Sequence, residues 1–317
     1  MKDVFVKDLK KYMGQSIVTF FMVSSVEIKK GSTGKTYLDL LLTDNSGDVP
    51  GKKWSVDIPD RELKIGDIVK VRCEVTDFNN QTQIKVERIR LVDETDEIDV
   101  KDFVKASPID SNVMYDEILK YANDIKDEDL KRVSLRVLED NKEKLLFYPA
   151  AKRNHHAMYG GLLYHMLRML RMGLGMCDVY TNLRADFIVT GVIIHDIEKI
   201  NEIIADNNGI SSDYSVEGKL LGHIIMGVKT IDKLCIELGV NDEKRLMLDH
   251  MILSHHYEPD FGSPKKPLFP EAEALHYLDM IDAKMFDIEE AYNKAEIGDF
   301  SERVWTLDNR SIYHDTL

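Results

Sequence analysis

The sequence predicts a multidomain protein of the β plus α class, in which a small β barrel precedes an all-α bundle. The chain has 317 residues, which suits two ordinary domains. Residues 15–92 carry short apolar segments with a period of two between turn signals. From about residue 113 onward the apolar residues recur with helical spacing instead.

Five segments within residues 15–92 are rich in Val, Ile, Thr and aromatic residues. Turn signals such as Lys30-Gly31-Ser32 and Asn45-Ser46-Gly47 separate them. In the stretch from Tyr37 to Leu42, leucine stands at every second position, which indicates one buried face. The order and length of these segments resemble an OB-fold, a small five-stranded barrel. We therefore expect an OB-like nucleic-acid-binding domain at residues 1–92.

An acidic segment that ends in a Ser-Pro break follows, and we interpret residues 93–112 as a linker. Helical patterns are then expected over 113–125, 127–145, 160–179, 183–205, 215–239, 241–257 and 270–296. Gly239 should end one of these helices and Asn241 should cap the next. No β pattern recurs, so residues 113–317 are expected to form an all-α bundle.

Composition narrows the class of protein. No apolar run approaches the roughly 20 residues that a membrane span needs, and the N-terminus lacks the apolar block of a secretory signal. Three widely separated cysteines, Cys73, Cys177 and Cys235, fit neither a disulfide framework nor a zinc ribbon. We therefore expect a cytoplasmic protein without a membrane segment.

The net charge of −14 is unevenly distributed. Residues 1–92 contain 16 Lys and Arg against 13 Asp and Glu, whereas residues 93–317 contain 26 against 43. The first part is mildly basic and the second strongly acidic. An acidic body can still bind a polyanion if divalent cations neutralise its cleft.

Histidines and aspartates recur about one helix apart within apolar, helix-like stretches. They are His165, His195, Asp196, His223, His255, His256 and Asp279. A lone histidine in such a place is usually hydrogen-bonded in the core, but a series of them is costly unless they are paired or coordinated. Imidazole is a preferred ligand of zinc, manganese, iron, cobalt and nickel, and a carboxylate suits manganese and magnesium. The series therefore favours a metal centre with hydrolytic chemistry.

Lys199 follows Asp196 by three residues and His195 by four, so on a helix it would project from the same face. There it could hold a phosphate oxygen. The alternative is an exposed helix lysine.

The order of a first His, a His-Asp pair, further histidines and a late Asp resembles the HD-domain phosphohydrolase superfamily. The motifs NHHAMYGGLLYHML, HDIEKI, LLGHI, LSHHYEPDFGSPKKP and EAEALHYLDMIDAKM follow an OB-like module. Together they resemble the YhaM-type 3′-5′ exoribonucleases of low-GC Gram-positive bacteria over nearly the whole chain.

The resemblance implies two metal sites. His165, His195, Asp196 and Asp279 would be the primary ligands, and His223, His255 and His256 would serve a second ion. It implies manganese, with cobalt as a substitute; iron, nickel and zinc are the other candidates. It also implies degradation of single-stranded RNA from the 3′ end to nucleoside 5′-monophosphates. We expect attack by a metal-bound hydroxide, with Asp196 bridging the ions and Lys199 stabilising the phosphate charge.

The barrel is expected to bind single-stranded RNA by stacking bases on aromatic rings and pairing phosphates with Lys and Arg. The candidates are Lys35, Tyr37, Lys52, Lys53, Trp54, Phe78 and Arg88. For Trp54 and Phe78, a place in the barrel core is an equal alternative. His155 and His156 lie in a loop-like stretch, where they would contact substrate or cap a helix.

Two positions depart from the resemblance. Glu198 stands where many HD enzymes have glycine, and Tyr164 where relatives often have Glu, which leaves the metal preference open. An HD-family nucleotidase, a cyclic-nucleotide phosphodiesterase and a non-catalytic RNA-binding protein with a relic HD domain are the alternative functions. Single-stranded DNA is the alternative substrate, and the apolar helices leave a homo-oligomer open.

Overall fold

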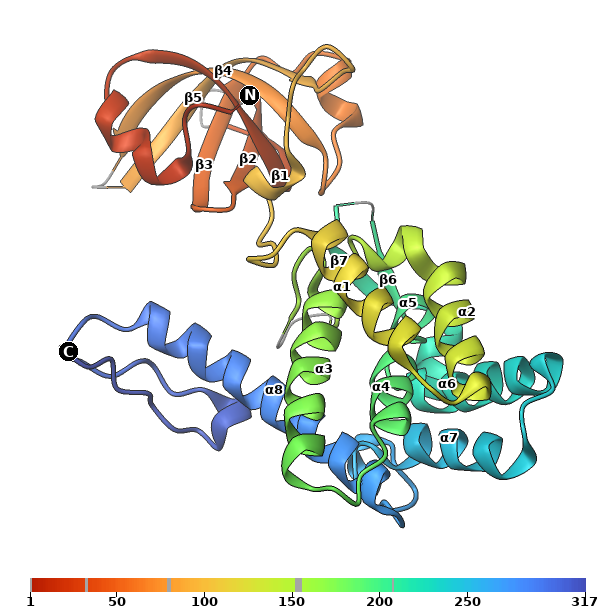
Figure 1. Ribbon diagram of the computed structural model, residues 1–317. Coiled ribbons are helices and arrows are strands. Elements are labelled where there is room, and N and C mark those ends of the chain that lie inside the picture. Colours follow the sequence, from red (N-terminus) through yellow and green to blue (C-terminus); the bar gives the residue numbers. More distant parts are fainter. Residues whose placement is uncertain (1, 32–33, 79–80, 152–155, 207) are drawn as a thin grey trace. The chain divides into compact units, whose positions relative to one another are not determined.

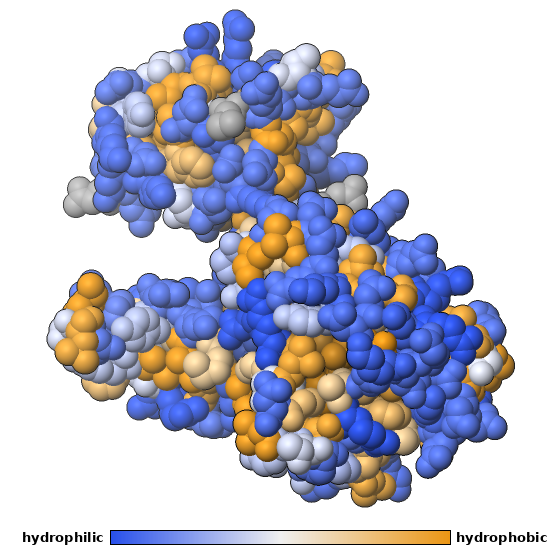
Figure 2. All heavy atoms as spheres, viewed as in Figure 1, coloured by the Kyte–Doolittle hydropathy of each residue, from blue (hydrophilic) through white to orange (hydrophobic). Residues whose placement is uncertain are grey.

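The computed structural model describes residues 2–31, 34–78, 81–151, 156–206 and 208–317 (Figure 1). The chain divides into two compact units, Met1–Lys105 and Ala106–Leu317. This division falls inside the segment that we interpreted as a linker, which contains one short 3-10 helix, Val100–Asp102. Hydrophilic side chains cover most of the visible surface of each unit, with apolar side chains in smaller groups between them (Figure 2).

The first unit is a closed five-stranded barrel of the OB type, as predicted. Its strands are β1 (Ser16–Lys30), β2 (Thr36–Asp44), β3 (Gly47–Trp54), β4 (Ile68–Phe78) and β5 (Gln81–Leu91). They close in the order β1-β2-β3-β5-β4. The pairing of β3 with β5 is parallel and the other pairings are antiparallel. The described residues of this unit also form three short 3-10 helices, Val6–Tyr12, Pro59–Glu62 and Val100–Asp102.

The barrel closes around the apolar positions that alternate along its strands. Leu38, Leu40 and Leu42 of β2 point inward and are buried, whereas the residues between them remain partly open. On the N-terminal segment, the Lys2 ammonium lies 3.0 Å from the Asp44 carboxylate, and both side chains are inaccessible to solvent. This buried ion pair ties the start of the chain to the end of β2.

The second unit is a bundle of helices around one apolar core. The helices are α1 (Ser111–Asp124), α2 (Glu128–Leu145), α3 (Gly161–Val179), α4 (Ala185–Ile194), α5 (Lys199–Glu202), α6 (Val216–Leu238), α7 (Asp242–Ser254) and α8 (Pro270–Lys294). Helix α3 packs against α1, α4 and α8 (Figure 1). Two further 3-10 helices, Pro259–Phe261 and Trp305–Leu307, lie before and after α8. Within the described ranges, no helix is both long and apolar enough to cross a membrane.

The predicted helix ends between α6 and α7 are confirmed. Gly239 adopts a left-handed conformation at the end of α6, and the side chain of Asn241 accepts hydrogen bonds from the first backbone amides of α7. The prediction of one helix over 183–205 is wrong. Helix α4 ends at Ile194, a turn and the short α5 follow, and Ile203–Ala205 (β6) pairs with Ser211–Tyr214 (β7) as a small hairpin.

Candidate active site

The His-Asp pair lies at the C-terminal end of α4. Phe187 and every later residue of this helix are buried, so the helix runs through the middle of the unit and delivers its last residues to the interior. His195 and Asp196 are each 1% exposed. The ring of His195 donates from Nδ1 to the carbonyl of Val192 at 2.9 Å, which leaves Nε2 to face the site.

Five histidines from α3, α4, α6 and the end of α7 are oriented in the same manner. In each ring, Nδ1 is bonded to a fixed acceptor at 2.7–3.0 Å, and Nε2 is turned toward the site. The pairs are His165 with Asp282, His195 with Val192, His223 with Glu202, His255 with Ile252 and His256 with Phe261. Such a bond fixes both the tautomer and the direction of a metal-ligating imidazole.

Among the described residues, potential ligand atoms form three groups, in each of which they lie within 4.8 Å of one another, and two of these groups consist of the predicted ligands. One group is Asp196, His223, His255 and His256; the other is His165, His195 and Asp279. The site thus brings together all seven residues that we predicted as ligands.

Asp196 lies between the two groups. Its Oδ2 is 3.3 Å from Nε2 of His195, and its Oδ1 is 3.4 Å from Nε2 of His223. Asp279 also faces both groups, at 3.4 Å from Nε2 of His165 and 3.8 Å from Nε2 of His256. One carboxylate placed in this way can serve two ions at once.

The buried polar atoms of the site fit a metal centre. Nε2 of His165, His195, His223 and His255 and Oδ1 of Asp196 have no hydrogen-bond partner among the described residues. Each such buried atom costs about 1–3 kcal/mol when it stays unsatisfied. A cluster of imidazole nitrogens and carboxylate oxygens is the ligand set that divalent transition metals prefer, so cations bound there would satisfy all these atoms together.

The carboxylates of the site are held in their ionised form. Burial by itself raises the pKa of Asp196, but the neighbouring Lys199 and His195 lower it well below the ordinary value. The pKa of Asp279 is likewise lowered against the effect of burial, chiefly by His165. Burial holds the pKa of His255 well below its ordinary value, so this imidazole is neutral at pH 7, as a ligand must be.

Lys199 lies in the site. It opens α5, and its Nζ is 2.6 Å from Oδ2 of Asp196 while its side chain is only 12% exposed. The alternative prediction, that Lys199 is an exposed helix lysine, is therefore wrong. An ammonium group in this position can donate to a phosphate oxygen beside the ligands.

Asp282 also belongs to the site, although we did not predict it from the sequence. Its buried carboxylate accepts hydrogen bonds from Nδ1 of His165 and Nε2 of His156, each at 2.7 Å, and lies 2.6 Å from Nε of Arg168. Asp282 follows Asp279 by three residues on α8, so one face of that helix supplies both a predicted ligand and the partner of another predicted ligand.

Glu202 has the same relation to His223. Its two carboxylate oxygens accept hydrogen bonds from the backbone amide and from Nδ1 of His223, each at 3.0 Å. Helix α6 is interrupted at Gly222, whose φ of 71° and ψ of 159° turn the next residue toward Glu202.

His156 does not have the role that we predicted, because it is inaccessible to solvent and its ring packs against Phe286 while Nε2 meets Asp282. A buried ring of this kind positions a neighbour and does not contact substrate. His155 lies outside the described residues. Glu198 is buried and accepts a hydrogen bond from Asn201 in the next turn. The ring of Tyr164 meets that of His156 edge to face and lies near Arg168.

On the barrel, Trp54 and Phe78 are 48% and 60% exposed, so the alternative that they belong to the core is wrong. The rings of Tyr37 and Trp54 lie 4.8 Å apart, and Nζ of Lys52 is 5.6 Å from the Tyr37 ring and 5.9 Å from the Phe78 ring. Together with β4 and β5 residues, Lys52, Trp54 and Phe78 line a hollow of about 350 Å³.

Lys53 and Arg88 do not share this surface. Lys53 is buried and forms an ion pair with Asp60 at 2.6 Å, so its charge is neutralised within the barrel and a role in binding phosphate is wrong. Arg88 lines a separate hollow of about 530 Å³ with Lys70 and Arg72. Lys35 is exposed at the start of the segment that leads into β2.

Comparisons with known proteins identify a matching family and related chains. Residues 162–284 match the family model of the HD domain, which implies a divalent metal site at the groups described above. The 3′-5′ exoribonuclease YhaM of Geobacillus sp. strain WCH70 is 37% identical over 302 residues, which cover 95% of this chain and 92% of that protein. YhaM of Bacillus subtilis strain 168 is 37% identical over 305 residues, with 96% of each chain covered.

Among solved structures, the second OB-fold domain of replication protein A from Methanococcus maripaludis aligns with 27% of this chain. The alignment covers 91% of that domain, at 23% identity and a TM-score of 0.23.

Proposed function

Because this chain belongs to the family of YhaM 3′-5′ exoribonucleases, we propose that its buried His-Asp centre removes nucleotides one at a time from the 3′ end of single-stranded RNA. The chain is a metal-dependent hydrolase of the HD type. The observation that supports the proposed site is the position of Asp196, whose two oxygens face two separate groups of imidazoles.

We propose that His165, His195, Asp196 and Asp279 hold one ion and that His223, His255 and His256, with Asp196, hold a second. When bound, these ions supply positive charge that acidifies water and neutralises the phosphate. Manganese suits a set that mixes imidazole with carboxylate, and cobalt, iron, nickel and zinc share this preference in part.

The residues of the chain perform two further tasks. The carboxylates of Asp282 and Glu202 hold the rings of His165 and His223 in place. The Lys199 ammonium donates to a non-bridging oxygen of the scissile phosphate. Hydrolysis adds one water across the P–O3′ bond, so that the hydroxide joins phosphorus and the proton goes to the departing 3′ oxygen. The products are a nucleoside 5′-monophosphate and a strand shortened by one residue.

We further propose that Tyr37, Lys52, Trp54 and Phe78 form the surface of the barrel that grips the strand. Exposed aromatic rings offer stacking faces to any base, and Lys52 beside them offers a charge for a phosphate. A mononucleotide substrate would leave such a surface without a task, which favours a polymer over the nucleotidase alternative.

The test uses purified protein, manganese and single-stranded RNA labelled at its 5′ end. The wild type should produce a ladder of strands that shorten by single residues, and a chelator should stop it. Asp196→Ala should lose at least about 1000-fold in rate, because both groups of ligands lose their shared member. Asp140→Asn, in which an exposed surface carboxylate is removed, is the matched control and should keep wild-type activity.

Single-stranded DNA of the same sequence, assayed in parallel, measures the preference for RNA. Near-normal RNA degradation by the Asp196 variant would refute the proposed site. Release of phosphate from free nucleotides without shortening of RNA would refute the proposed substrate and favour the nucleotidase.

A further inference from the structure

The ligands of the HD centre are not equally accessible, and the difference shows from which side a substrate enters. The side chains of His195 and His255 are 1% and 0% exposed. Those of His223 and His256 are 11% and 22% exposed, and that of Asp279 is 15% exposed. The centre is therefore closed on the side of His195 and open on the side of His223 and His256.

Phe261 is an exposed aromatic residue whose backbone is hydrogen-bonded to His256, one of the two histidines on this open side. Phe261 ends the 3-10 helix Pro259–Phe261 and is 69% exposed. Its carbonyl accepts the hydrogen bond from Nδ1 of His256 at 2.7 Å. The next residue, Gly262, lies so close to Ile224, the neighbour of His223, that a Cβ atom built on it would be 3.2 Å from the Ile224 side chain.

The loop that carries Phe261 is closed by its own hydrogen bonds. The amide of His256 donates to Oγ of the buried Ser263 at 3.0 Å, and the amide of Phe261 donates to the carbonyl of Glu258 at 3.0 Å. Gly262 has a φ of 98°, a left-handed conformation that lets the loop turn back. An exposed ring on an ordered loop loses little freedom when a ligand covers it.

We propose that Phe261 is the platform on which the base of the 3′-terminal nucleotide stacks while its phosphate lies in the HD centre. This rests on the proposed exoribonuclease function and names the part of the substrate that the open side receives. An enzyme that removes nucleotides in turn must accept every base, and a flat ring does so because all four bases have a π face. A single exposed apolar side chain is common on protein surfaces. What distinguishes Phe261 is its backbone, because its carbonyl holds His256 and the following Gly262 lies close to Ile224 beside His223.

The experiment is a double-mutant cycle between the ring and the base. Short RNA oligonucleotides end either in adenosine or in an abasic ribose, and kcat/KM is measured for the wild type and for Phe261→Ala with manganese. Each single change should reduce kcat/KM about 10-fold, in line with the loss of one stacked base. Both changes together should also reduce it only about 10-fold, because each removes the same contact.

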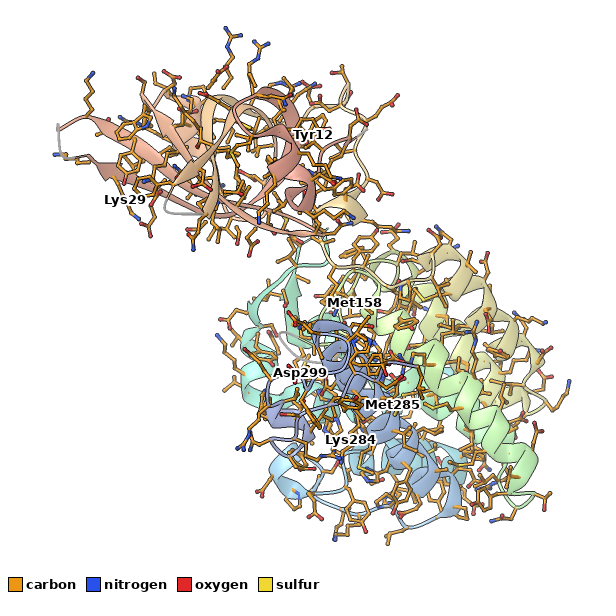
Figure 3. All side chains as sticks on the ribbon, turned by 90° about the vertical axis from the view of Figure 1, so that its left-hand side faces the viewer. Tyr12, Lys29, Met158, Lys284, Met285 and Asp299 are labelled. Atoms are coloured by element: carbon orange, nitrogen blue, oxygen red, sulfur yellow. The ribbon has the colours of Figure 1, made fainter. Side chains whose placement is uncertain are left out.

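Two variants complete the design. Phe261→Tyr keeps the stacking face and should keep wild-type sensitivity to the base. Phe300→Ala is the matched control, since Phe300 is 62% exposed, follows Asp299 of the C-terminal segment (Figure 3) and packs on Tyr313 with the ring centres 5.1 Å apart. It should leave kcat/KM unchanged on both substrates.

Independent losses, in which the double change costs about 100-fold, would overturn the proposal, and so would wild-type behaviour of Phe261→Ala. Manganese content is measured for every variant, and a lower content in Phe261→Ala would show that the residue acts through His256 and would also overturn it. The proposed function fails separately, because in that case the wild type does not shorten the adenosine-ended substrate at all.

Discussion

Replacing Asp282 by alanine removes the carboxylate that three side chains share. Asp282 has no exposed surface, and its oxygens lie 2.6–2.7 Å from His156, His165 and Arg168. The imidazoles are buried with it, and the Arg168 side chain is 18% exposed. Arg168 retains Glu289 at 2.9 Å, but that partner is 52% exposed and lies on the outer side. The substitution therefore leaves a charge and two ring nitrogens without their acceptor.

The magnitude follows from burial. Removing one partner of a buried ion pair costs about 3–5 kcal/mol, against a typical stability of about 5–15 kcal/mol for a whole domain. For a unit of this size, that loss lowers the midpoint of thermal unfolding by roughly 10 °C. Since His165 also loses the group that orients it, manganese affinity should fall about 10- to 100-fold.

Calorimetry of the chelator-treated protein measures the first effect, and calorimetric titration with manganese measures the second. Glu289→Ala removes the exposed partner of the same arginine and should cost at most about 1 kcal/mol. Asp282→Asn keeps the shape of the side chain but places an amide donor against the donors of His156, His165 and Arg168. Its losses of stability and of manganese affinity should therefore lie between those of Asp282→Ala and Glu289→Ala. If Asp282→Ala loses no more stability or affinity than Glu289→Ala, the carboxylate does not support the site.

Three further predictions concern other parts of the chain. Burial and the neighbouring carboxylate of Asp232 raise the pKa of Asp249 from its ordinary 3.8 to about 7. Between these two pH values the native state keeps a proton that the unfolded state has lost. The free energy of unfolding therefore falls as the pH rises from about 4 to about 7. Asp249→Asn should therefore gain on the order of 2 kcal/mol in urea unfolding at pH 8, with a smaller gain at pH 5. A Cβ on Gly161 would lie 2.0 Å from the carbonyl oxygen of His156, so Gly161→Ala should cost about 1–3 kcal/mol, whereas Gly175→Ala, with nothing within 4 Å, should cost nothing. Trp54→Ala should weaken RNA binding about 10-fold in fluorescence anisotropy without changing its dependence on salt, because it removes a stacking face and no charge.

The features that could be predicted from the sequence are those that depend on local pattern. The alternation of leucines in Leu38–Leu42 follows from one buried face of a strand, and β2 has that pattern. The histidines that we propose as ligands could be found because each one interrupts an apolar helix face, where a polar ring is costly without a partner. Local pattern also predicted the cap of α7 at Asn241.

The features that could not be predicted depend on contacts between distant residues. The stretch after Ile194 has helical spacing as far as Ala205, but the strand Ile203–Ala205 exists because it pairs with Ser211–Tyr214. No local pattern distinguishes the two outcomes. Burial of the Lys53 ammonium likewise depends on its ion pair with Asp60, which lies outside β3, the strand that contains Lys53.

Local pattern accounts for the Nδ1 acceptors of some histidines of the site, and contacts between distant residues account for others. His195 and His255 follow the last residues of α4 and α7, and each ring donates to the carbonyl three residues earlier, which the end of a helix leaves without an intrahelical partner. His165 lies inside α3, where the carbonyls are already bonded within the helix, and its ring is held by the carboxylate of Asp282.

His223 directly follows the kink at Gly222, and its ring is held by the carboxylate of Glu202. His195 and His255 therefore need only their own helices, whereas His165 and His223 need an acidic residue from elsewhere in the fold. Since a carboxylate makes the imidazole a stronger base than a carbonyl does, His165 and His223 should be the more electron-rich ligands, one in each half of the centre. Removal of Glu202 or Asp282 should then weaken one metal site more than the other, whereas removal of Asp196 should weaken both.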